Sequence, residues 1–490
     1  MAGGQMAGGE SGTRAPVVSG SAQRRTTTLG TFLFWILFAV ALAVRVGIAL
    51  GGQFIHHPDE IFQTIEQSHR VVFGYGLVPW EYVEGIRWWG LPLFLSLPMR
   101  VASWFGGGPD VYMPAIHIMV AAISVLPFPY LFVVLSRRFG GLIAALSCAI
   151  PMFWYENIAL SSNTLSDSIS APFLGLCAIL PFAIRWSWRS LVVWTGLLVL
   201  TFSLRFHLAP ALAVIAISAW VLMSARDKKL SLIFVGLWLL VVAVFDMATG
   251  LWPFQHVWLN LWRNIFDGVA ATFGTSPWYT YLESMVFNWG AVAGGVGAGI
   301  VLVTIRQHWR LTLPAILVVL AFSFIGHKEY RFYFPATLLM TIAMAWAVAY
   351  LARSIATDIQ PRGLAWIGTL FPVLVCAVIA IPNQARFQIL FQQQEDNEIA
   401  AMRYLAQQDD LCGVITSELI WYTAGYVYLH RDVPFAQTGV GEASLASPEF
   451  NYLHYVDDGT PPPAPYMDSV CFNHPMSQAI CVAHRAGDCG

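Results

Sequence analysis

Long apolar runs recur along the chain from residue 29 to about residue 382, and short polar segments separate them. The first run, 29–50, has about 22 residues, enough for a helix to cross a bilayer at roughly 20 residues per crossing. The pattern predicts eleven membrane-spanning helices, at 29–50, 112–135, 139–153, 167–184, 190–202, 208–224, 230–249, 286–305, 311–326, 332–351 and 364–382. We therefore predict an all-α polytopic membrane protein over residues 29–382.

Composition agrees with this prediction. Hydrophobic residues make up 57% of the chain and charged residues only 11%, whereas a soluble domain is about 25% charged. This small number of charges cannot cover the surface of a water-soluble globule of 490 residues. Lipid must therefore solvate much of the surface. The net charge of -2 also gives no reason to expect a nucleic-acid partner.

Basic residues set the expected orientation. Groups of them precede the first predicted span and follow every second one, and such residues favour cytoplasmic loops. They are Arg24 with Arg25, Arg137 with Arg138, Arg185 with Arg189, Arg226 with Lys228 and Lys229, Arg306 with Arg310, and Arg353 with Arg362. This places the N-terminus in the cytoplasm and, with eleven spans, the C-terminus outside. Residues 1–28, rich in Gly, Ser and Thr, are expected to form a disordered cytoplasmic tail.

The dense polar clusters then all fall on the external face. They lie in loop 51–111, in loop 154–166, near residues 205–207 and at residues 327–331. Loop 250–285 is Trp-rich and amphipathic, which is typical of a segment lying in the membrane interface. A transporter would more often place its binding residues near the midplane.

Composition changes after residue 382. Residues 383–490 are polar and alternate helix-like and strand-like stretches, so we predict a small external α/β-like domain. Cys412, Cys471, Cys481 and Cys489 lie there, and external cysteines tend to pair as disulfides. Four cysteines allow three connectivities, which sequence alone leaves open. No close cysteine pair has the usual spacing of zinc ligands.

The most suggestive short motif is His57-Pro58-Asp59-Glu60, directly after the first span. Pro58 can start a helix and leaves both acids in its first turn. One interpretation is that the acids simply favour the positive end of the helix. The other is that one carboxylate is a general base, held near lipid where its basicity can rise.

A second cluster, His327-Lys328-Glu329-Tyr330-Arg331, interrupts two apolar runs. Its two fixed positive charges, with Arg205 and His207, lie on the external face against the usual charge bias. A lipid phosphate would suit them, although a single Lys could merely extend its charge toward water. Trp278 and Tyr279 could flank a lipid chain, or could belong to an anchoring aromatic belt.

The sequence carries no P-loop, no dinucleotide fingerprint and no DxD-like acidic pair. A metal-bound nucleotide sugar is therefore not an expected substrate, and neither a metal nor another cofactor is predicted. A donor carried by a lipid phosphate would supply an activated group within the membrane itself.

Five segments together resemble the dolichol-phosphate-mannose-dependent mannosyltransferases of glycosyltransferase family 22, which include the GPI-anchor and ALG types. These segments occur in family order and cover residues 30–340. They are the His57 motif with His69-Arg70-Val71-Val72-Phe73-Gly74-Tyr75-Gly76 and Trp80-Glu81-Tyr82, the Ser161 to Ser168 run, Thr201-Phe202-Ser203-Leu204-Arg205, Phe273-Gly274-Thr275-Ser276-Pro277-Trp278-Tyr279, and the 327–332 cluster with Phe334-Pro335. The N-terminal tail and the lack of an ER-retention signal are typical of a bacterial homologue.

The resemblance implies the C-type integral membrane glycosyltransferase fold and an inverting transfer on the external face. A hexose, expected to be mannose, would move from a polyprenyl- or dolichyl-phosphate sugar to a glycan or glycolipid acceptor, forming an α-linkage. Asp59 and Glu60 would be catalytic. The leaving phosphate would be bound by Arg205, His207, His327, Lys328 and Arg331. The acceptor or sugar would contact His57, Trp80, Glu81, Trp278 and Tyr279.

Two other classes remain open from the sequence. A flippase or transporter of lipid-linked sugars would share the spans and the phosphate affinity without needing a base, and an inactive scaffold would tolerate substitutions in the polar clusters. Within the enzyme class, the sugar could instead be arabinose or glucose. The acceptor itself cannot be read from the sequence.

Overall fold

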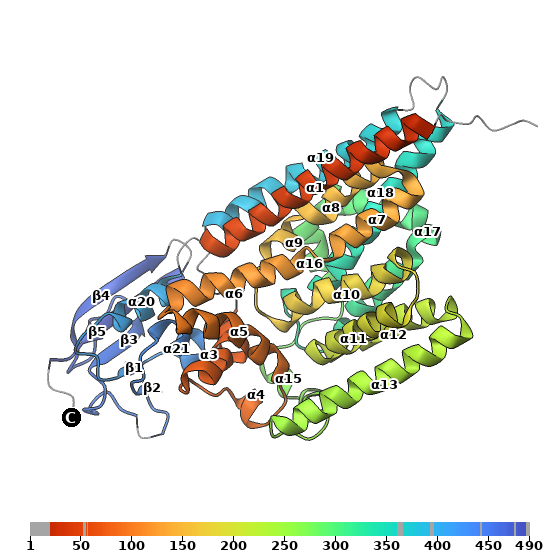
Figure 1. Ribbon diagram of the computed structural model, residues 1–490. Helices are drawn as coiled ribbons and strands as arrows, with labels where there is room; N and C mark the ends of the chain where they lie inside the picture. The colour runs from red at the N-terminus through yellow and green to blue at the C-terminus, as the bar shows by residue number, and fades with distance from the viewer. Residues whose placement is uncertain are drawn as a thin grey trace, which may run out of the picture.

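The computed structural model describes residues 20–51, 55, 57–359, 366–392, 396–441, 443–474 and 477–486. Within them, a bundle of apolar helices carries a small α/β unit beside one end (Figure 1). Five helical segments are long and apolar enough to cross a membrane. They comprise α1 (Gly20–Gly51), α6 (Pro109–Ser124) continuing into α7 (Pro127–Phe139), α10 (Ser166–Ala183), α13 (Ala225–Ala248) and α18 (Phe334–Asp358).

Four shorter apolar helices complete most of the bundle. They are α8 (Gly141–Phe153), α11 (Trp188–Leu204), α12 (Ala209–Val221) and α19 (Trp366–Gln392). Two boundaries differ from the sequence prediction. Helix α1 already begins at Gly20, inside the tail predicted to be disordered, because no proline interrupts 20–28; residues 1–19 of that tail lie outside the described residues. Helix α19 continues beyond residue 382 to Gln392.

Helix α17 (Ala291–Ser323) is two helices that meet at His308, where the backbone leaves the helical region (φ -140°, ψ 21°). A straight helix of 33 residues would be about 50 Å long. Yet both ends lie beside η4 (Tyr330–Tyr333). Trp289 at one end and Tyr330 both donate to Glu156, and Phe322 at the other end stacks on Phe332. The chain therefore reverses at His308, and the two halves match the separately predicted spans 286–305 and 311–326.

The core of the bundle surrounds α18, which packs against α7, α8, α10, α17 and α19. Its buried face is rich in alanine, and small residues let neighbouring helices approach closely within a bilayer. The fully buried alanines are Ala336, Ala343, Ala345, Ala347, Ala349 and Ala352. Helix α13 contrasts with α18, because its exposed Leu232, Leu237 and Leu240 present an apolar surface suited to lipid.

Short helices gather at one end of the bundle. Those within the predicted loop 51–111 are α2 (Pro58–Glu60), η1 (Ile61–Ile65), α3 (Glu66–Phe73), α4 (Trp80–Val83) and α5 (Gly90–Trp104). The others are α9 (Tyr155–Ala159), η2 (Phe206–Leu208), α14 (Gln255–Leu261), η3 (Trp262–Phe266), α15 (Val269–Thr272) and α16 (Thr280–Trp289). Exposed Trp252, Trp262 and Phe266 agree with an interfacial position for loop 250–285.

The C-terminal unit has a five-stranded mixed sheet of order β2-β1-β3-β5-β4. Strand β1 pairs in parallel with β2 and β3, while β5 pairs antiparallel with β3 and β4. Its elements are α20 (Asn397–Ala406), β1 (Val414–Thr416), η6 (Ile420–Tyr422), α21 (Gly425–Leu429), β2 (Phe435–Gln437), β3 (Tyr452–Val456), β4 (Met467–His474) and β5 (Ser477–His484). The predicted small α/β unit is present.

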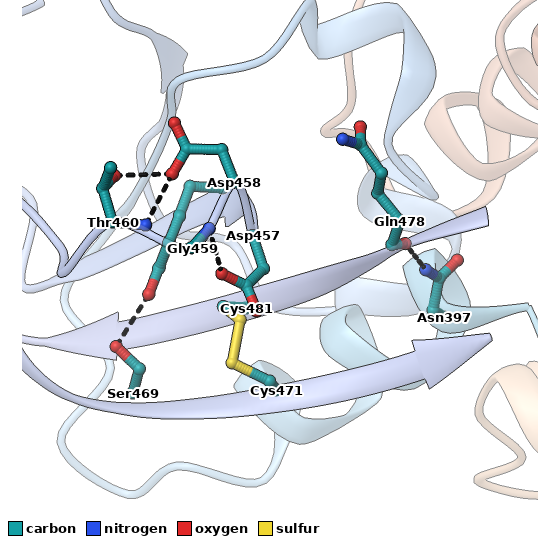
Figure 2. Close-up of a disulfide and its surroundings, with 10 residues drawn as sticks. Asn397, Asp457, Asp458, Gly459, Thr460, Ser469, Cys471, Gln478 and Cys481 are labelled. Carbon is teal, nitrogen blue, oxygen red and sulfur yellow. Dashed lines mark hydrogen bonds between the residues drawn. A yellow bond between two sulfur atoms is a disulfide. The ribbon is translucent and has the colours of Figure 1, made fainter.

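A disulfide joins Cys471 of β4 to Cys481 of β5, at positions directly opposite in the sheet (Figure 2). In the same view, Asn397 of α20 donates to the backbone carbonyl of Gln478 and holds the helix on the sheet. Cys412 is disulfide-bonded as well, and Cys489 lies outside the described residues. The prediction of disulfides in this unit is thus confirmed for Cys471 and Cys481.

The C-terminal unit docks on α3. The buried carboxylate of Glu66 accepts hydrogen bonds from the backbone N–H of Leu77 (2.8 Å) and of Val427 in α21 (3.1 Å). His69 and His430 lie side by side, with Nε2 and Nδ1 3.1 Å apart. A Cβ at Gly425 (φ +58°) would meet Glu66 Oε2 at 2.8 Å, so this contact requires glycine. Polar groups on α3 therefore position the last hundred residues.

Candidate active site

Asp59 lies in the first turn of a helical rod that runs from Pro58 through η1 and α3 to Phe73. His57 precedes it in an extended conformation (φ -158°), and its Nδ1 accepts the backbone N–H of Asp59 at 3.1 Å. Pro58 occupies the first helical position, where no backbone donor is needed. The predicted helix start is confirmed, and it aims Asp59 into the cluster formed by residues 327–331.

The centre of the site is an ion cluster. Arg331 donates to Asp59 Oδ2 at 2.5 Å and to Glu329 Oε2 at 2.5 Å. Glu329 also lies 3.2 Å from His57 Nε2 and 2.8 Å from His327 Nε2. Two carboxylates share one guanidinium, so with neutral histidines the cluster carries one net negative charge. The two motifs singled out in the sequence thus meet in space.

These contacts decide the protonation of Asp59. Burial alone would raise the pKa of the Asp59 carboxyl, but the charges of Arg331, Arg87 and His57 and the hydrogen bond from Arg331 outweigh it and lower the pKa. Burial also raises the pKa of Glu329, but neighbouring charges and hydrogen bonds outweigh it and lower that pKa to about 2. The expected rise in basicity near lipid is therefore wrong for Asp59, because Arg331 lies beside it. The carboxylate is ionised at neutral pH, as a proton acceptor must be.

A second ion pair lies deeper. Arg205 Nε is 2.7 Å from Asp167 Oδ1, and both side chains are buried. The Arg205 guanidinium also packs over the ring of Phe332, with its carbon 4.9 Å from the ring centroid. His207 stacks on Phe206 at 4.0 Å, and its Nδ1 is buried with no hydrogen-bond partner among the described residues.

Arg205 and His207 line a pocket between the rod and the ends of α10 and α11. Its lining includes charged and polar side chains, which could bind a charged or hydroxylated ligand. Other lining residues are Gln63, Thr64, Tyr82, Arg87, Trp88, Ser166, Ser203, His256 and Asn260. This pocket is the region where we expect donor and acceptor to meet.

Glu60, predicted to be catalytic, is buried and turned toward the chain interior. Its carboxylate accepts the backbone N–H of Thr164 at 3.0 Å and the side-chain amide of Asn163 at 3.2 Å. These contacts fasten the loop before α10, which carries Asp167. The geometry makes Glu60 an anchor for that loop.

We expect Glu60→Ala to lower stability by about 2–6 kcal/mol, because two buried donors lose their acceptor at roughly 1–3 kcal/mol each. Glu60→Gln should lose less, since its carbonyl can still accept the N–H of Thr164. Thermal unfolding in detergent measures the effect, with the exposed Glu283→Ala as control. A Glu60→Ala protein of normal stability that transfers no sugar would instead support the predicted catalytic role.

The remaining predicted residues are more scattered. Glu81 is buried, accepts the amide of Gln63 at 2.7 Å and lies 3.8 Å from Arg87. Lys328 donates to the carbonyl of Ile325 at 2.5 Å, so it lies beside the ion cluster without joining it. Trp80 is half-buried at the start of α4.

Trp278 and Tyr279 are exposed and pack against each other with ring centroids 5.8 Å apart. Their loop reaches the cluster through other residues: Gly274 O lies 3.2 Å from His327 Nδ1, Ser276 N–H donates to Gly326 O, and the ring centroid of Phe273 lies 6.1 Å from that of His327. The structure therefore does not bring these two rings into the ion cluster.

Three acidic residues of the site were not predicted. Glu329 links both motifs, Asp167 neutralises Arg205, and Glu156 accepts hydrogen bonds from Trp154, Trp289 and Tyr330. Asp167 could have been found, because an ionisable residue at the start of an apolar span is costly and marks function. No comparable sequence signal distinguishes Glu329 from its neighbours.

One group of side chains within the site has the spacing of metal ligands. His57, Asp59 and Glu329 place one ligand atom each within 4.8 Å of one another. Arg331 already pairs with both carboxylates and supplies positive charge there. The expected absence of a metal stays a prediction.

Comparison with known proteins identifies the family of this chain. The model of the Alg9-like mannosyltransferase family matches residues 35–430. GPI mannosyltransferase 3 of Drosophila melanogaster is 26% identical over 331 residues, covering 61% of this chain and 54% of that protein. GPI alpha-1,2-mannosyltransferase 3 of Mus musculus is 25% identical over 353 residues, covering 67% of this chain and 61% of that protein. The match thus spans less than two thirds of each relative.

The solved structure of ArnT from Cupriavidus metallidurans bound to undecaprenyl phosphate shares the fold. Its TM-score is 0.59 at 12% identity, covering 91% of this chain and 97% of that chain. The apo state of ArnT gives a TM-score of 0.58. The expected C-type membrane glycosyltransferase fold is confirmed. Since the family model covers most of the sequence, the chain belongs to the Alg9-like mannosyltransferase family.

Proposed function

We propose that this protein transfers a mannosyl residue from a polyprenyl- or dolichyl-phosphate mannose to a hydroxyl of a glycan or glycolipid. The observation that carries the proposal is the ion pair of Asp59 with Arg331, together with a pocket lined by Arg205 and by Arg87, whose charge also acts on Asp59. A proton acceptor and anion-binding groups are the two requirements for displacing a phosphate from a sugar. Family membership supplies the sugar class.

The reaction we propose is a single displacement. The acceptor hydroxyl attacks the anomeric carbon opposite the phosphate, and Asp59 takes its proton. Arginine donors stabilise the charge that develops on the leaving phosphate. One displacement inverts the anomeric centre, so a β-linked donor yields an α-mannoside. No metal or other cofactor enters this scheme.

Arg331 gives the scheme a physical condition. In the present conformation it is fully engaged by Asp59 and Glu329. A donor phosphate forms the same kind of charge-assisted hydrogen bonds with a guanidinium as a carboxylate does. When the phosphate binds Arg331, the positive charge of Arg331 stabilises the Asp59 carboxylate less, and Asp59 becomes a stronger base. Donor binding would thus activate the acceptor site.

The position of the cluster favours transfer over transport. All its members lie among the short helices at one end of the bundle, whereas a transporter usually binds its substrate near the midplane. We place this end, and the C-terminal unit, on the external face, with the N-terminus cytoplasmic. Residues 29–382 would form the catalytic membrane domain and 383–490 an external domain.

The test is an incubation of the purified full-length protein with a panel of lipid-phosphate sugars carrying mannose, glucose or arabinose. Candidate glycolipid acceptors are added, and products are identified by mass spectrometry and by sensitivity to an α-mannosidase. We expect one added hexose, from the mannose donor only. Movement of the intact lipid-linked sugar across vesicles, without transfer, would contradict the proposal and support a flippase.

A further inference from the structure

A second polar pocket, of about 220 Å³, lies at the other end of the bundle. It is formed where α17 reverses at His308, against α7, α10 and α18. Three arginines and three aromatic residues line it: Arg138, Arg306, Arg310, Phe182, Trp309 and Trp346. Trp346 is twelve residues beyond Phe334 on α18, roughly 18 Å along the helix from the candidate active site. The pocket is therefore separate from that site.

The reversal of α17 brings the arginines together. His308 is buried between two hydroxyls, with Nε2 3.0 Å from Thr304 Oγ1 and Nδ1 2.8 Å from Thr312 Oγ1. These contacts tie both halves of α17 to the turn. Arg306 and Arg310 precede and follow His308, so both reach the same pocket.

No carboxylate pairs with these three arginines among the described residues. Arg138 lies over Trp346 at 4.6 Å and over Phe182 at 5.8 Å, and the nearby charge of Arg310 repels it. Arg310 lies over Trp309, and its Nε is buried without a hydrogen-bond partner. Several like charges gathered around one pocket repel one another, and an anion in the pocket would offset that repulsion.

We propose that this pocket binds the phosphate group of an anionic membrane lipid, on the face opposite the candidate active site. A guanidinium can form bidentate hydrogen bonds with phosphate oxygens. The pocket opens beside apolar surface on α17, where Leu302 and Val303 are 64% and 82% exposed. An acyl chain can lie on that surface while the headgroup enters the pocket. Basic pockets between membrane helices on the cytoplasmic side are typical headgroup sites.

The inference is independent of sugar transfer, so its test measures lipid alone. The full-length protein is reconstituted with phosphatidylcholine containing phosphatidylglycerol, extracted in mild detergent and analysed for retained lipid by native mass spectrometry. We expect retained phosphatidylglycerol on the wild type. Arg306→Gln with Arg310→Gln should lower its affinity about tenfold or more, since the variant loses two charge-assisted contacts to the phosphate.

Arg226→Gln is the matched control, because this exposed arginine at the start of α13 lies at a predicted cytoplasmic end but does not line the pocket. It should retain lipid as the wild type does. If the double variant folds poorly, Arg306→Gln alone serves, since Arg306 is exposed. Undiminished retention by the double variant, or by Arg306→Gln where it replaces the double variant, would overturn the proposal, as would full displacement of the lipid by an equal concentration of inorganic phosphate.

Discussion

Replacing Asp59 by Asn is expected to lower mannosyl transfer by about 100- to 10,000-fold, the usual contribution of a general base. Asn keeps the shape of the side chain and loses its basicity. Folding should change little, because Arg331 keeps its contact with Glu329. Turnover at saturating donor, measured beside thermal stability, separates the two effects.

The matched control is Asp110→Asn. Asp110 is also a first-turn aspartate that pairs with an arginine, Arg403, but it is exposed on α6 far from the ion cluster. It should leave turnover unchanged. Near-normal turnover in Asp59→Asn would exclude Asp59 as the base and move attention to Glu329.

The pH profile of the wild type gives an independent check. The pKa of Asp59 is lowered against the upward effect of burial, chiefly by Arg331. The pKa of Asp59 is lower in the folded protein than in the unfolded chain. The ion pair is therefore present above the pKa of the unfolded state and is lost only as the pH falls through the pKa of the folded state. An ordinary aspartate titrates near pH 4. The acid limb of kcat/KM should therefore lie at a lower pH than that.

Replacing Asp167 by Asn is expected to cost about 3–5 kcal/mol of stability, because it leaves Arg205 as an uncompensated buried charge. The two side chains are 1% and 8% exposed, so water cannot replace the lost carboxylate. Thermal unfolding of the purified protein measures the loss. The exposed Asp267→Asn serves as control.

A second variant keeps this prediction testable if Asp167→Asn does not fold. Asp167→Leu combined with Arg205→Met replaces the buried pair by apolar groups of similar size, which is often neutral or stabilising. We expect this protein to be stable and to use the donor poorly, since Arg205 is gone. Normal donor kinetics in the stable double variant would show that the pair has only a structural role.

Local features of the sequence anticipated much of the site. Pro58 fixes where a helix begins, and that rule needs only neighbouring residues. The alternation of apolar and polar segments placed both the 57–60 and the 327–331 motifs at one end of the bundle. Their direct contact joins Asp59 and Arg331 across 272 positions of sequence, and no local rule specifies which pair of charges will meet.

One error has the same origin. The basicity expected for Asp59 considered the membrane surroundings but not Arg331, which only the tertiary fold brings within 2.5 Å. Glu60 was predicted to be catalytic beside Asp59, and that role stays a prediction. Neighbouring positions on a helix point about 100° apart, so one carboxylate reaches the ion cluster and the other reaches Thr164.

The docking of α21 on α3 also concerns how the protein is made. The rod that carries Asp59 is among the first parts of the chain to be synthesised, and it ends in α3. Glu66 in that helix accepts the N–H of Val427, yet it is synthesised 361 residues before Val427. Arg331 likewise arrives long after Asp59. A nascent chain therefore holds Asp59 without its counter-charge until Arg331 is made, and α3 lacks the support of α21 until the C-terminal unit is made.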